Sequence, residues 1–309
     1  MKIAVIALGG NALTRKGDKG TYQELKNNIG KSMKFLIPIL KKYKTVIVSG
    51  SGPQIGSIIL KNEIAKNKVP QMPLHVLDAQ LEGELGYLIE QSLMNELNKH
   101  KLQIPVVTTL NQVLVDKKDK AFTYPTKPVG PYYMLKEAIK LRKKGYDMKN
   151  DAGKGFRRIV ASPKPIKIIE ADIIKTLLKS GTIIISTGGG GIPVYLEKSS
   201  LKGVDAVIDK DRASSCLAKS INANLLFILT DISKVYLNYK KKNQTELKKV
   251  KLDDIKGYLE EGHFLEGSMK PKIEAAIEFL ENSGEKVIIT SPESLSKALN
   301  GKDGTIITR

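Results

Sequence analysis

The chain has 309 residues, of which 41% are hydrophobic and 27% charged, an ordinary composition for a globular enzyme of one large α/β unit or two modest lobes. No run of 18 apolar residues is present, and the first apolar run is too brief for a signal peptide, so we expect neither a membrane partner nor a secretory leader. The single cysteine, Cys216, excludes an intrachain disulfide framework and favours a cytoplasmic location; we expect it to pack inside a helix.

The formal net charge of +19 has two interpretations, a nucleic-acid surface or a solvated coat of lysine. Only six of the 51 basic residues are arginine, the lysines are spread along the chain, and aromatic residues make up 6%. Proteins that bind phosphates and bases usually supply arginine and exposed aromatic rings. We therefore favour the lysine coat and expect no nucleic-acid partner.

Strand and helix patterns alternate along the chain. Short runs rich in Ile and Val predict buried strands at 2–8, 44–48, 104–109, 182–187, 225–230 and 286–290. Apolar residues spaced three and four apart predict amphipathic helices at 21–43, 75–98, 169–179 and 271–283; the first has the stripe Tyr22, Leu25, Ile29, Met33, Leu36 and Leu40. This alternation predicts an α/β fold with a mostly parallel sheet covered on both faces.

Residues 117–165 interrupt the alternation. Proline, glycine and charged residues cluster there, between one predicted strand and the next predicted helix. A long segment of this kind is typical of an insertion, so we expect a small subdomain that projects from the main sheet.

Glycine-rich segments follow three of the predicted strands, and a Thr-Asp pair ends a fourth. Ligands of open α/β sheets bind beyond the carboxyl ends of the strands, where glycine lets backbone N–H groups approach an anion. None of the segments matches a dinucleotide-binding or P-loop motif. They are Gly9-Gly10-Asn11, Gly50-Ser51-Gly52-Pro53-Gln54, Gly188–Gly191 and the strand end Thr230-Asp231.

Three lysines lie in unusual local sequences. Lys210 stands between Asp209 and Asp211 at the predicted start of a helix, where the alternative is an ordinary N-cap with a surface ion pair. Lys272 lies in the predicted first turn of a helix, where a cation opposes the helix dipole. Lys127 lies between two prolines in PTKPVGP, which is otherwise a stiff connector.

No nucleophile–base pair or metal-ligand spacing is evident. His75, His100 and His263 are far apart in sequence, and we expect each to be structural. Phosphoryl transfer requires cations and backbone donors around the moving group and little covalent chemistry. That reaction class suits the glycine-rich segments and the lysines.

The motifs together resemble those of the carbamate kinases in the amino-acid kinase superfamily. The resemblance covers essentially the whole chain, in order. It includes VIALGGNAL (5–13), PTKPVGP (125–131), GGGGIPV (188–194), GVDAVIDKD (203–211) and EGHFLEGSMKPKIEAAI (261–277).

This resemblance implies a three-layer αβα sandwich with a mainly parallel open sheet and a projecting subdomain. It implies an N-terminal lobe, 1–212, for carbamate or carbamoyl phosphate, and a C-terminal lobe, 213–309, for ADP or ATP. The implied reaction is reversible: ATP and carbamate give ADP and carbamoyl phosphate, with Mg²⁺ on the nucleotide. A homodimer is also implied. We expect the cell to use the reaction to make ATP in arginine catabolism; the alternative that the sequence leaves open is the supply of carbamoyl phosphate for biosynthesis.

The resemblance assigns roles residue by residue. Lys127, Lys210 and Lys272 would contact the phosphoryl groups, and Asp211 would orient the lysines. The carbamate pocket would be formed by Gly9, Gly10, Asn11, Gly50, Ser51 and Gly52. The nucleotide pocket would be formed by Asp209, Asp231, Val235, Tyr236, Met269 and Lys272. No protein-bound metal site is implied.

Two positions distinguish this chain within the superfamily. Acetylglutamate kinases have a lysine just before the first glycine pair, whereas this chain has Ala7-Leu8, and the resemblance implies that Lys127 supplies the cation instead. The second glycine loop of carbamate kinases usually has the sequence HGNGPQ, whereas this chain has Ser49 and Ser51 in place of the histidine and asparagine. These serines leave open the affinity for carbamate and the identity of the acceptor.

Two alternatives therefore remain. One is a related kinase that phosphorylates another small carboxylate. The other is a basic binding module that kept the fold and lost catalysis; such a module would be expected to have lost some of the three lysines, and all three are present.

Overall fold

The computed structural model of the chain describes residues 1–15, 17–150, 155–282 and 284–309. Two expected segments extend beyond these: residues 151–154 of the subdomain and residue 283 of the last predicted helix lie outside the described residues. Within them, no helix is both long and apolar enough to cross a bilayer.

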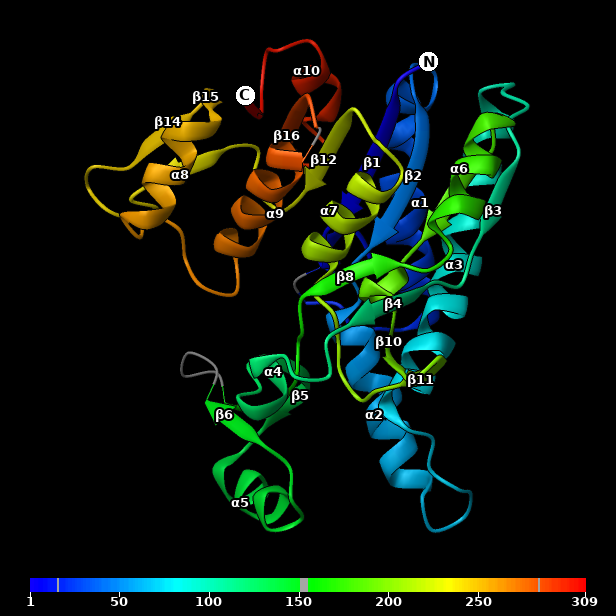
Figure 1. Ribbon diagram of the computed structural model, residues 1–309, viewed down its shortest axis with the longest axis vertical. Coiled ribbons are helices and arrows are strands. Elements are labelled where there is room, and N and C mark those ends of the chain that lie inside the picture. Colours follow the sequence, from blue (N-terminus) through cyan, green and yellow to red (C-terminus); the bar gives the residue numbers. More distant parts are fainter. Residues whose placement is uncertain (16, 151–154, 283) are drawn as a thin grey trace.

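An eight-stranded sheet forms the centre of the molecule, with the order β15-β17-β16-β12-β1-β2-β9-β3 (Figure 1). All six predicted strands lie in it, and the pairs among them are parallel. They are β1 (Ile3–Leu8), β2 (Lys44–Ser49), β3 (Val106–Thr108), β9 (Ile183–Ser186), β12 (Leu225–Leu229) and β16 (Lys286–Thr290). The short strands β15 (Lys249–Lys251), at one edge, and β17 (Thr305–Thr308), next to it, were not predicted, and β17 is antiparallel to β16.

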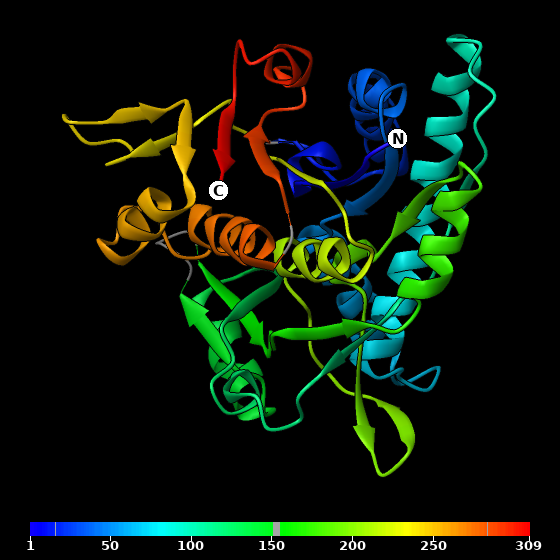
Figure 2. The same ribbon diagram turned by 45° about the horizontal axis from the view of Figure 1, so that its top comes forward.

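Helices cover both faces of this sheet, which confirms the three-layer αβα sandwich. Alternate residues of β1 point to opposite faces: Ile6 and Leu8 belong to one buried apolar cluster, and Val5 and Ala7 to the other. The first cluster includes residues of α1 (Tyr22–Leu40), α2 (Gly52–Ala65), α3 (Leu74–Lys99) and α10 (Leu295–Leu299). The second includes residues of α6 (Ala171–Lys179), α7 (Lys210–Ser220), α8 (Leu252–Glu260) and α9 (Met269–Asn282). Figure 2 shows α7 and α9 side by side.

The first helix shows how local sequence sets an element. The hydroxyl of Thr21 accepts a hydrogen bond from the Glu24 N–H while the Glu24 carboxylate accepts one from the Thr21 N–H, a capping box that fixes the start of α1. The predicted stripe is buried from Leu25 to Leu40. Tyr22 is the exception, 57% exposed, because the first residue of the helix lies beyond the edge of the core.

A second, smaller sheet with the order β11-β10-β4-β8 was not predicted. Its strands are short and partly exposed, so they lack the continuous apolar runs of the central sheet. They are β4 (Gln112–Val115), β8 (Pro165–Ile168), β10 (Ile192–Glu197) and β11 (Ser200–Gly203). A two-stranded hairpin, β13 (Val235–Leu237) with β14 (Thr245–Leu247), lies in the C-terminal part.

The predicted insertion forms a unit that projects from the main body (Figure 1). It consists of a three-stranded antiparallel sheet, β5-β7-β6, with two short helices. The bounds are α4 (Lys120–Thr123), β5 (Lys127–Tyr133), α5 (Leu135–Lys143), β6 (Met148–Asn150) and β7 (Phe156–Val160). Lys127 therefore begins a strand and does not lie in a connector.

Helix α2 holds this subdomain through a close backbone contact. A Cβ atom placed on Gly56 would lie 2.3 Å from the Cα atom of Gly130, so only glycine at 56 allows α2 and β5 to approach so closely. Beside it, the Arg158 guanidinium donates to Glu63 at 3.2 Å and lies 4.3 Å from the ring centre of Tyr146. Lys127 thus belongs to a strand that is packed directly on α2.

Candidate active site

The three glycine-rich segments and the Thr230-Asp231 strand end meet at one edge of the sheet because their strands are in register. Leu8 pairs with both Ser49 and Leu229, and Val48 pairs with Ser186, so the loops after β1, β2, β9 and β12 begin at about the same level. The carboxyl ends of parallel strands are where open α/β sheets bind ligands.

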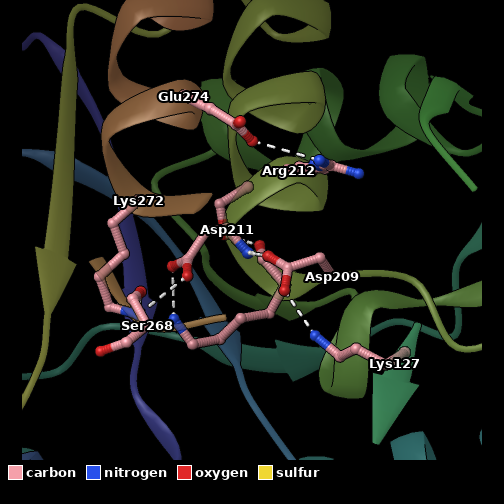
Figure 3. Close-up of polar contacts among 9 residues, drawn as sticks. Lys127, Asp209, Asp211, Arg212, Ser268, Lys272 and Glu274 are labelled. Atoms are coloured by element: carbon pink, nitrogen blue, oxygen red, sulfur yellow. Dashed lines mark hydrogen bonds and ion pairs between the residues drawn. The ribbon is translucent and has the colours of Figure 1, made fainter. Parts of the chain in front are cut away.

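The start of α7 lies at the centre of this edge. Asp209 is the N-cap residue, and its carboxylate accepts a hydrogen bond from the Asp211 N–H at 3.0 Å. The same carboxylate accepts an ion-paired hydrogen bond from Lys127 at 2.5 Å (Figure 3). One aspartate therefore caps the helix and holds the lysine that extends from the subdomain.

The second aspartate holds the other two lysines. Lys210 donates to one Asp211 oxygen at 2.5 Å, and Lys272, from α9, donates to the other at 3.2 Å (Figure 3). Lys272 also lies 3.3 Å from the carbonyl oxygen of Ser268. Three ammonium groups from distant parts of the sequence thus converge on two neighbouring carboxylates.

Burial and the neighbouring opposite charges shift the pKa values of these groups in opposite directions. Burial lowers the pKa of Lys210, Asp211 opposes that change, and the nearby Lys272 adds to it. Burial alone would raise the pKa of Asp209, but Lys127 and Lys210 outweigh it and hold that pKa well below its ordinary value. Asp209 is therefore ionised at neutral pH and has a lysine on each side.

The first two glycine loops lie against Lys210. A Cβ atom on Gly50 would lie 2.7 Å from the Cδ atom of Lys210 and 3.5 Å from the backbone N of Gly10. Gly9 is equally confined: its N–H donates to the Leu229 carbonyl at 2.8 Å, and a Cβ atom there would lie 2.7 Å from the same oxygen. Asn11 lies in the short helical turn η1 (Gly10–Ala12). Backbone N–H groups and one buried ammonium therefore share this position.

The second loop passes directly into a helix. Ser51 is buried and precedes α2, whose first residues are Gly52 and Pro53. The loop after β2 is thus shorter than predicted, because Gly52 belongs to the first turn of α2. The Ser49 hydroxyl is buried with no hydrogen-bond partner among the described residues.

A small cavity of about 70 Å³ follows β12. Asp231, Tyr236 and Met269, three of the residues predicted for nucleotide binding, line it. Tyr239, His263 and Phe264 also line it, and the sequence reasoning did not select them, although His263 and Phe264 lie in the GHF part of a quoted motif. Val235 does not line the cavity: its side chain is fully buried, and its N–H donates to the Thr305 hydroxyl.

A larger cleft of about 600 Å³ separates the subdomain from α9. Lys127 and Asp209 line it, together with residues that the sequence reasoning did not select, among them Lys149, Arg212, Lys270 and Glu274. Arg212 and Glu274 form an ion pair of 3.2 Å beside the aspartates (Figure 3). The cleft links the lysine cluster to the exposed side of the subdomain.

Cys216 packs inside a helix, as expected. Cys216 is buried in α7, and burial raises the pKa of its thiol to about 11, which makes it a packed residue and not a nucleophile. The described residues contain no group of three or more His, Cys, Asp or Glu able to hold a metal ion.

Comparisons with known proteins place the chain in a family. A sequence profile of the amino acid kinase family matches residues 2–291. The carbamate kinase of Pyrococcus horikoshii is 47% identical over 308 residues, covering 98% of each chain, and that of Trichomonas vaginalis is 44% identical with the same coverage. A solved structure of a carbamate kinase from Giardia lamblia bound to AMP-PNP superposes on this chain with a TM-score of 0.93 and 45% sequence identity. The match covers 99% of this chain and 98% of the Giardia chain.

Proposed function

The chain belongs to the amino acid kinase family and, within it, to the carbamate kinases, and we propose that it transfers a phosphoryl group reversibly between ATP and carbamate, giving ADP and carbamoyl phosphate. The observation that carries the proposal is the convergence of Lys127, Lys210 and Lys272 at the glycine loops. Carbamate, the phosphoryl group and ADP are all anionic and repel one another, and three preorganised cations offset that repulsion as the group moves.

We assign the roles from where each lysine lies. Lys210 contacts the phosphoryl group from the side of the Gly9-Gly10 and Gly50–Gly52 loops, where carbamate binds. Lys127 approaches from the subdomain, and Lys272 approaches from α9, on the side of the nucleotide phosphates. Asp209 and Asp211 hold the ammonium groups in position before the substrates arrive. No general base is needed, because the acceptor is already an anion.

We assign the nucleotide to the C-terminal lobe, 213–309, and the carbamoyl group to residues 1–212. The cavity lined by Asp231, Tyr236 and Met269 offers aromatic and apolar surface for a base, next to the helix that contains Lys272. Val235 is fully buried and is not among the residues that line this cavity, so we do not assign it a contact with the nucleotide.

Mg²⁺ fits this site as an ion that arrives on the nucleotide. Mg²⁺ usually keeps several waters and binds through one or two carboxylates together with substrate phosphates, which needs no cage of protein ligands. Asp209 and Asp231 are the carboxylates on the two sides of the cluster that could contact it or its waters. Bound there, the ion would neutralise charge on the phosphates.

We further propose a cytoplasmic homodimer that makes ATP in arginine catabolism. The single, buried thiol suits a reducing compartment. Tyr87 and Met94, seven residues apart on one face of α3, are 58% and 47% exposed, and such apolar surface suits a contact with a second copy.

A coupled assay tests the activity. With carbamoyl phosphate and MgADP we expect steady formation of ATP, abolished by EDTA and restored by excess Mg²⁺. Acetyl phosphate serves as the control for another small acyl phosphate. If ATP formed from acetyl phosphate but not from carbamoyl phosphate, the proposal would be wrong and the chain would be a kinase for a different carboxylate.

The contact between Gly56 and Gly130 gives a second test. Gly56→Ala would place a methyl group 2.3 Å from the backbone of β5, so the strand must move, and Lys127 moves with it. Because a shift of about 1 Å in a catalytic group can cost 10²-fold, we expect kcat to fall by at least tenfold. The measurement is kcat in the coupled assay, beside the melting temperature.

Gly83→Ala is the matched control, because Gly83 also lies inside a helix and a Cβ atom there meets nothing within 4 Å. This variant should keep its kcat, and its stability should equal or slightly exceed that of wild type, because alanine favours a helix more than glycine does. Equal kcat values for the two variants would show that the position of the subdomain does not depend on the α2 contact.

A further inference from the structure

Glu82 of α3 is a buried carboxylate for which the proposed reaction has so far no use. It is 1% exposed, and one of its oxygens accepts a hydrogen bond from the Gly188 N–H at 3.0 Å. The other oxygen accepts one from the Asn111 N–H, also at 3.0 Å. No lysine or arginine among the described residues forms an ion pair with it, so backbone donors alone compensate its burial.

The loop that Glu82 holds has an unfavourable backbone. Thr187 has φ +46°, in the left-handed region that costs a β-branched residue about 1–3 kcal/mol, and the three glycines 189–191 also have positive φ. Asn111, itself held by Glu82, accepts hydrogen bonds with its side-chain oxygen from the Thr187 N–H at 3.1 Å and the Ser186 hydroxyl at 2.8 Å. Glu82 therefore fixes this loop directly and through Asn111.

The same loop touches both halves of the lysine site. A Cβ atom on Gly189 would lie 2.6 Å from the hydroxyl oxygen of Ser51, in the acceptor loop. A Cβ atom on Gly190 would lie 2.2 Å from the carbonyl oxygen of Ile208, the residue before Asp209. The loop is thus packed between the acceptor loop and the start of α7, with no space for a side chain on either glycine.

We propose that Glu82 is a positioning residue for phosphoryl transfer, which holds the loop 187–191 and so sets the spacing between the bound carbamoyl group and Lys210. The proposal rests on the function proposed above. Glu82 touches neither substrate in this arrangement; it acts through Gly188 and Asn111.

The charge state of Glu82 gives a readout that a purely structural residue would not. Burial raises its pKa to about 8, with Glu170 adding to the rise and the Asn111 and Gly188 N–H groups opposing it. Asp78, one turn earlier on α3, also has a raised pKa, caused first by burial and then by Glu82. Backbone N–H groups bind a carboxylate more strongly than a carboxylic acid, so the loop is held most firmly once Glu82 has ionised.

The free energy of unfolding changes with pH in the opposite direction to the strength of these loop contacts. A folded pKa near 8, above the ordinary value of 4.5, means that the folded chain binds this proton more tightly than the unfolded chain does. The stabilisation is complete below about pH 4.5 and is lost as the pH rises through 8. Between about pH 5.5 and pH 8.5, the free energy of unfolding measured with denaturant should therefore fall more for wild type than for Glu82→Gln.

Glu82→Gln is the test, because glutamine keeps the shape and one acceptor but presents its NH₂ group to a backbone N–H. We expect kcat/KM for carbamoyl phosphate to fall about tenfold, the loss typical of one buried hydrogen bond, with KM for MgADP within twofold of wild type. Wild type should also show a rise in kcat/KM for carbamoyl phosphate centred near pH 8, and Glu82→Gln should lack it.

Glu96→Gln is the matched control. Glu96 is a buried glutamate on the same helix, 8% exposed, which pairs with Lys99 at 2.6 Å on the helix surface. Its kinetics and pH profile should match wild type. Wild-type kcat/KM and pH dependence in Glu82→Gln would overturn the proposal.

Gly189→Ala provides a second, independent variant in case Glu82→Gln does not fold. It displaces the loop without touching Glu82, and we expect the same fall in kcat/KM for carbamoyl phosphate with KM for MgADP unchanged. An unchanged kcat/KM for carbamoyl phosphate would overturn the proposal. Failure of the proposed function is distinguishable, because wild type itself would then make no ATP from carbamoyl phosphate.

Discussion

Lys127→Ala should lower kcat for ATP synthesis about 10²–10³-fold, the effect of removing one preorganised donor from a developing charge. Lys127 is the cation that the subdomain supplies, and its ammonium group is paired with Asp209 at the start of α7. Without it, Asp209 keeps its negative charge close to the path of an anionic phosphoryl group. The expected fall is therefore in kcat more than in KM, measured in the coupled assay with saturating carbamoyl phosphate and MgADP.

The matched control for Lys127 is another lysine of the subdomain. Lys136 lies exposed on α5, so Lys136→Ala removes the same charge without touching the cleft. It should retain wild-type kcat, and circular dichroism should show both variants folded. If Lys127→Ala kept more than half of the wild-type kcat, Lys127 would have no part in the reaction.

Asp211→Asn should damage both activity and stability. Asp211 is 3% exposed, and its two oxygens hold Lys210 and Lys272. Removing one partner of a buried ion pair leaves an uncompensated charge and costs about 3–5 kcal/mol of unfolding free energy. Because both lysines also lose their fixed positions, we expect kcat to fall by about 10² or more.

The pH profile separates the electrostatic role of Asp211 from a packing role. Burial already lowers the pKa of Lys210, and Asp211 opposes this change more strongly than Asp209 does. In Asp211→Asn the Lys210 pKa should fall further, so the remaining activity should decline at a lower pH than in wild type. Asp253→Asn, in the exposed first turn of α8, is the control and should change neither property. A wild-type alkaline limb in Asp211→Asn would contradict the assigned role.

The central sheet could be predicted because its strands are buried on both faces. Runs such as those at 182–187 and 225–230 contain almost nothing but Ile, Leu, Phe and Thr, which only a parallel strand covered by helices accommodates. Strands β15 and β17 and the second sheet were missed because these strands are short and none of them is buried along its whole length. Their pairing is decided by contacts distant in sequence, which periodicity does not record.

The lysine site was only partly predictable for a similar reason. Lys127, Lys210 and Lys272 were selected because each stands in a short, distinctive motif, and their convergence follows from the fold. Glu82 lies in a regular helix among apolar residues, and nothing local marks it as the anchor of a loop that begins more than 100 residues later. Arg212 and Lys149 likewise enter the cleft only through the placement of the subdomain.

The projecting subdomain contains Lys127, one of the three lysines of the proposed site, so this cation can move away when the subdomain opens. Its sheet has three short strands whose buried residues Val129 and Val160 belong to the main apolar cluster, and it rests on the main body through α2. Segments with so little buried surface open at a lower free energy than the global unfolding of the chain. We therefore expect catalytic activity to be lost at a lower temperature than the one at which the chain unfolds. Warming can move Lys127 away from the site while the large sheet and its covering helices remain folded.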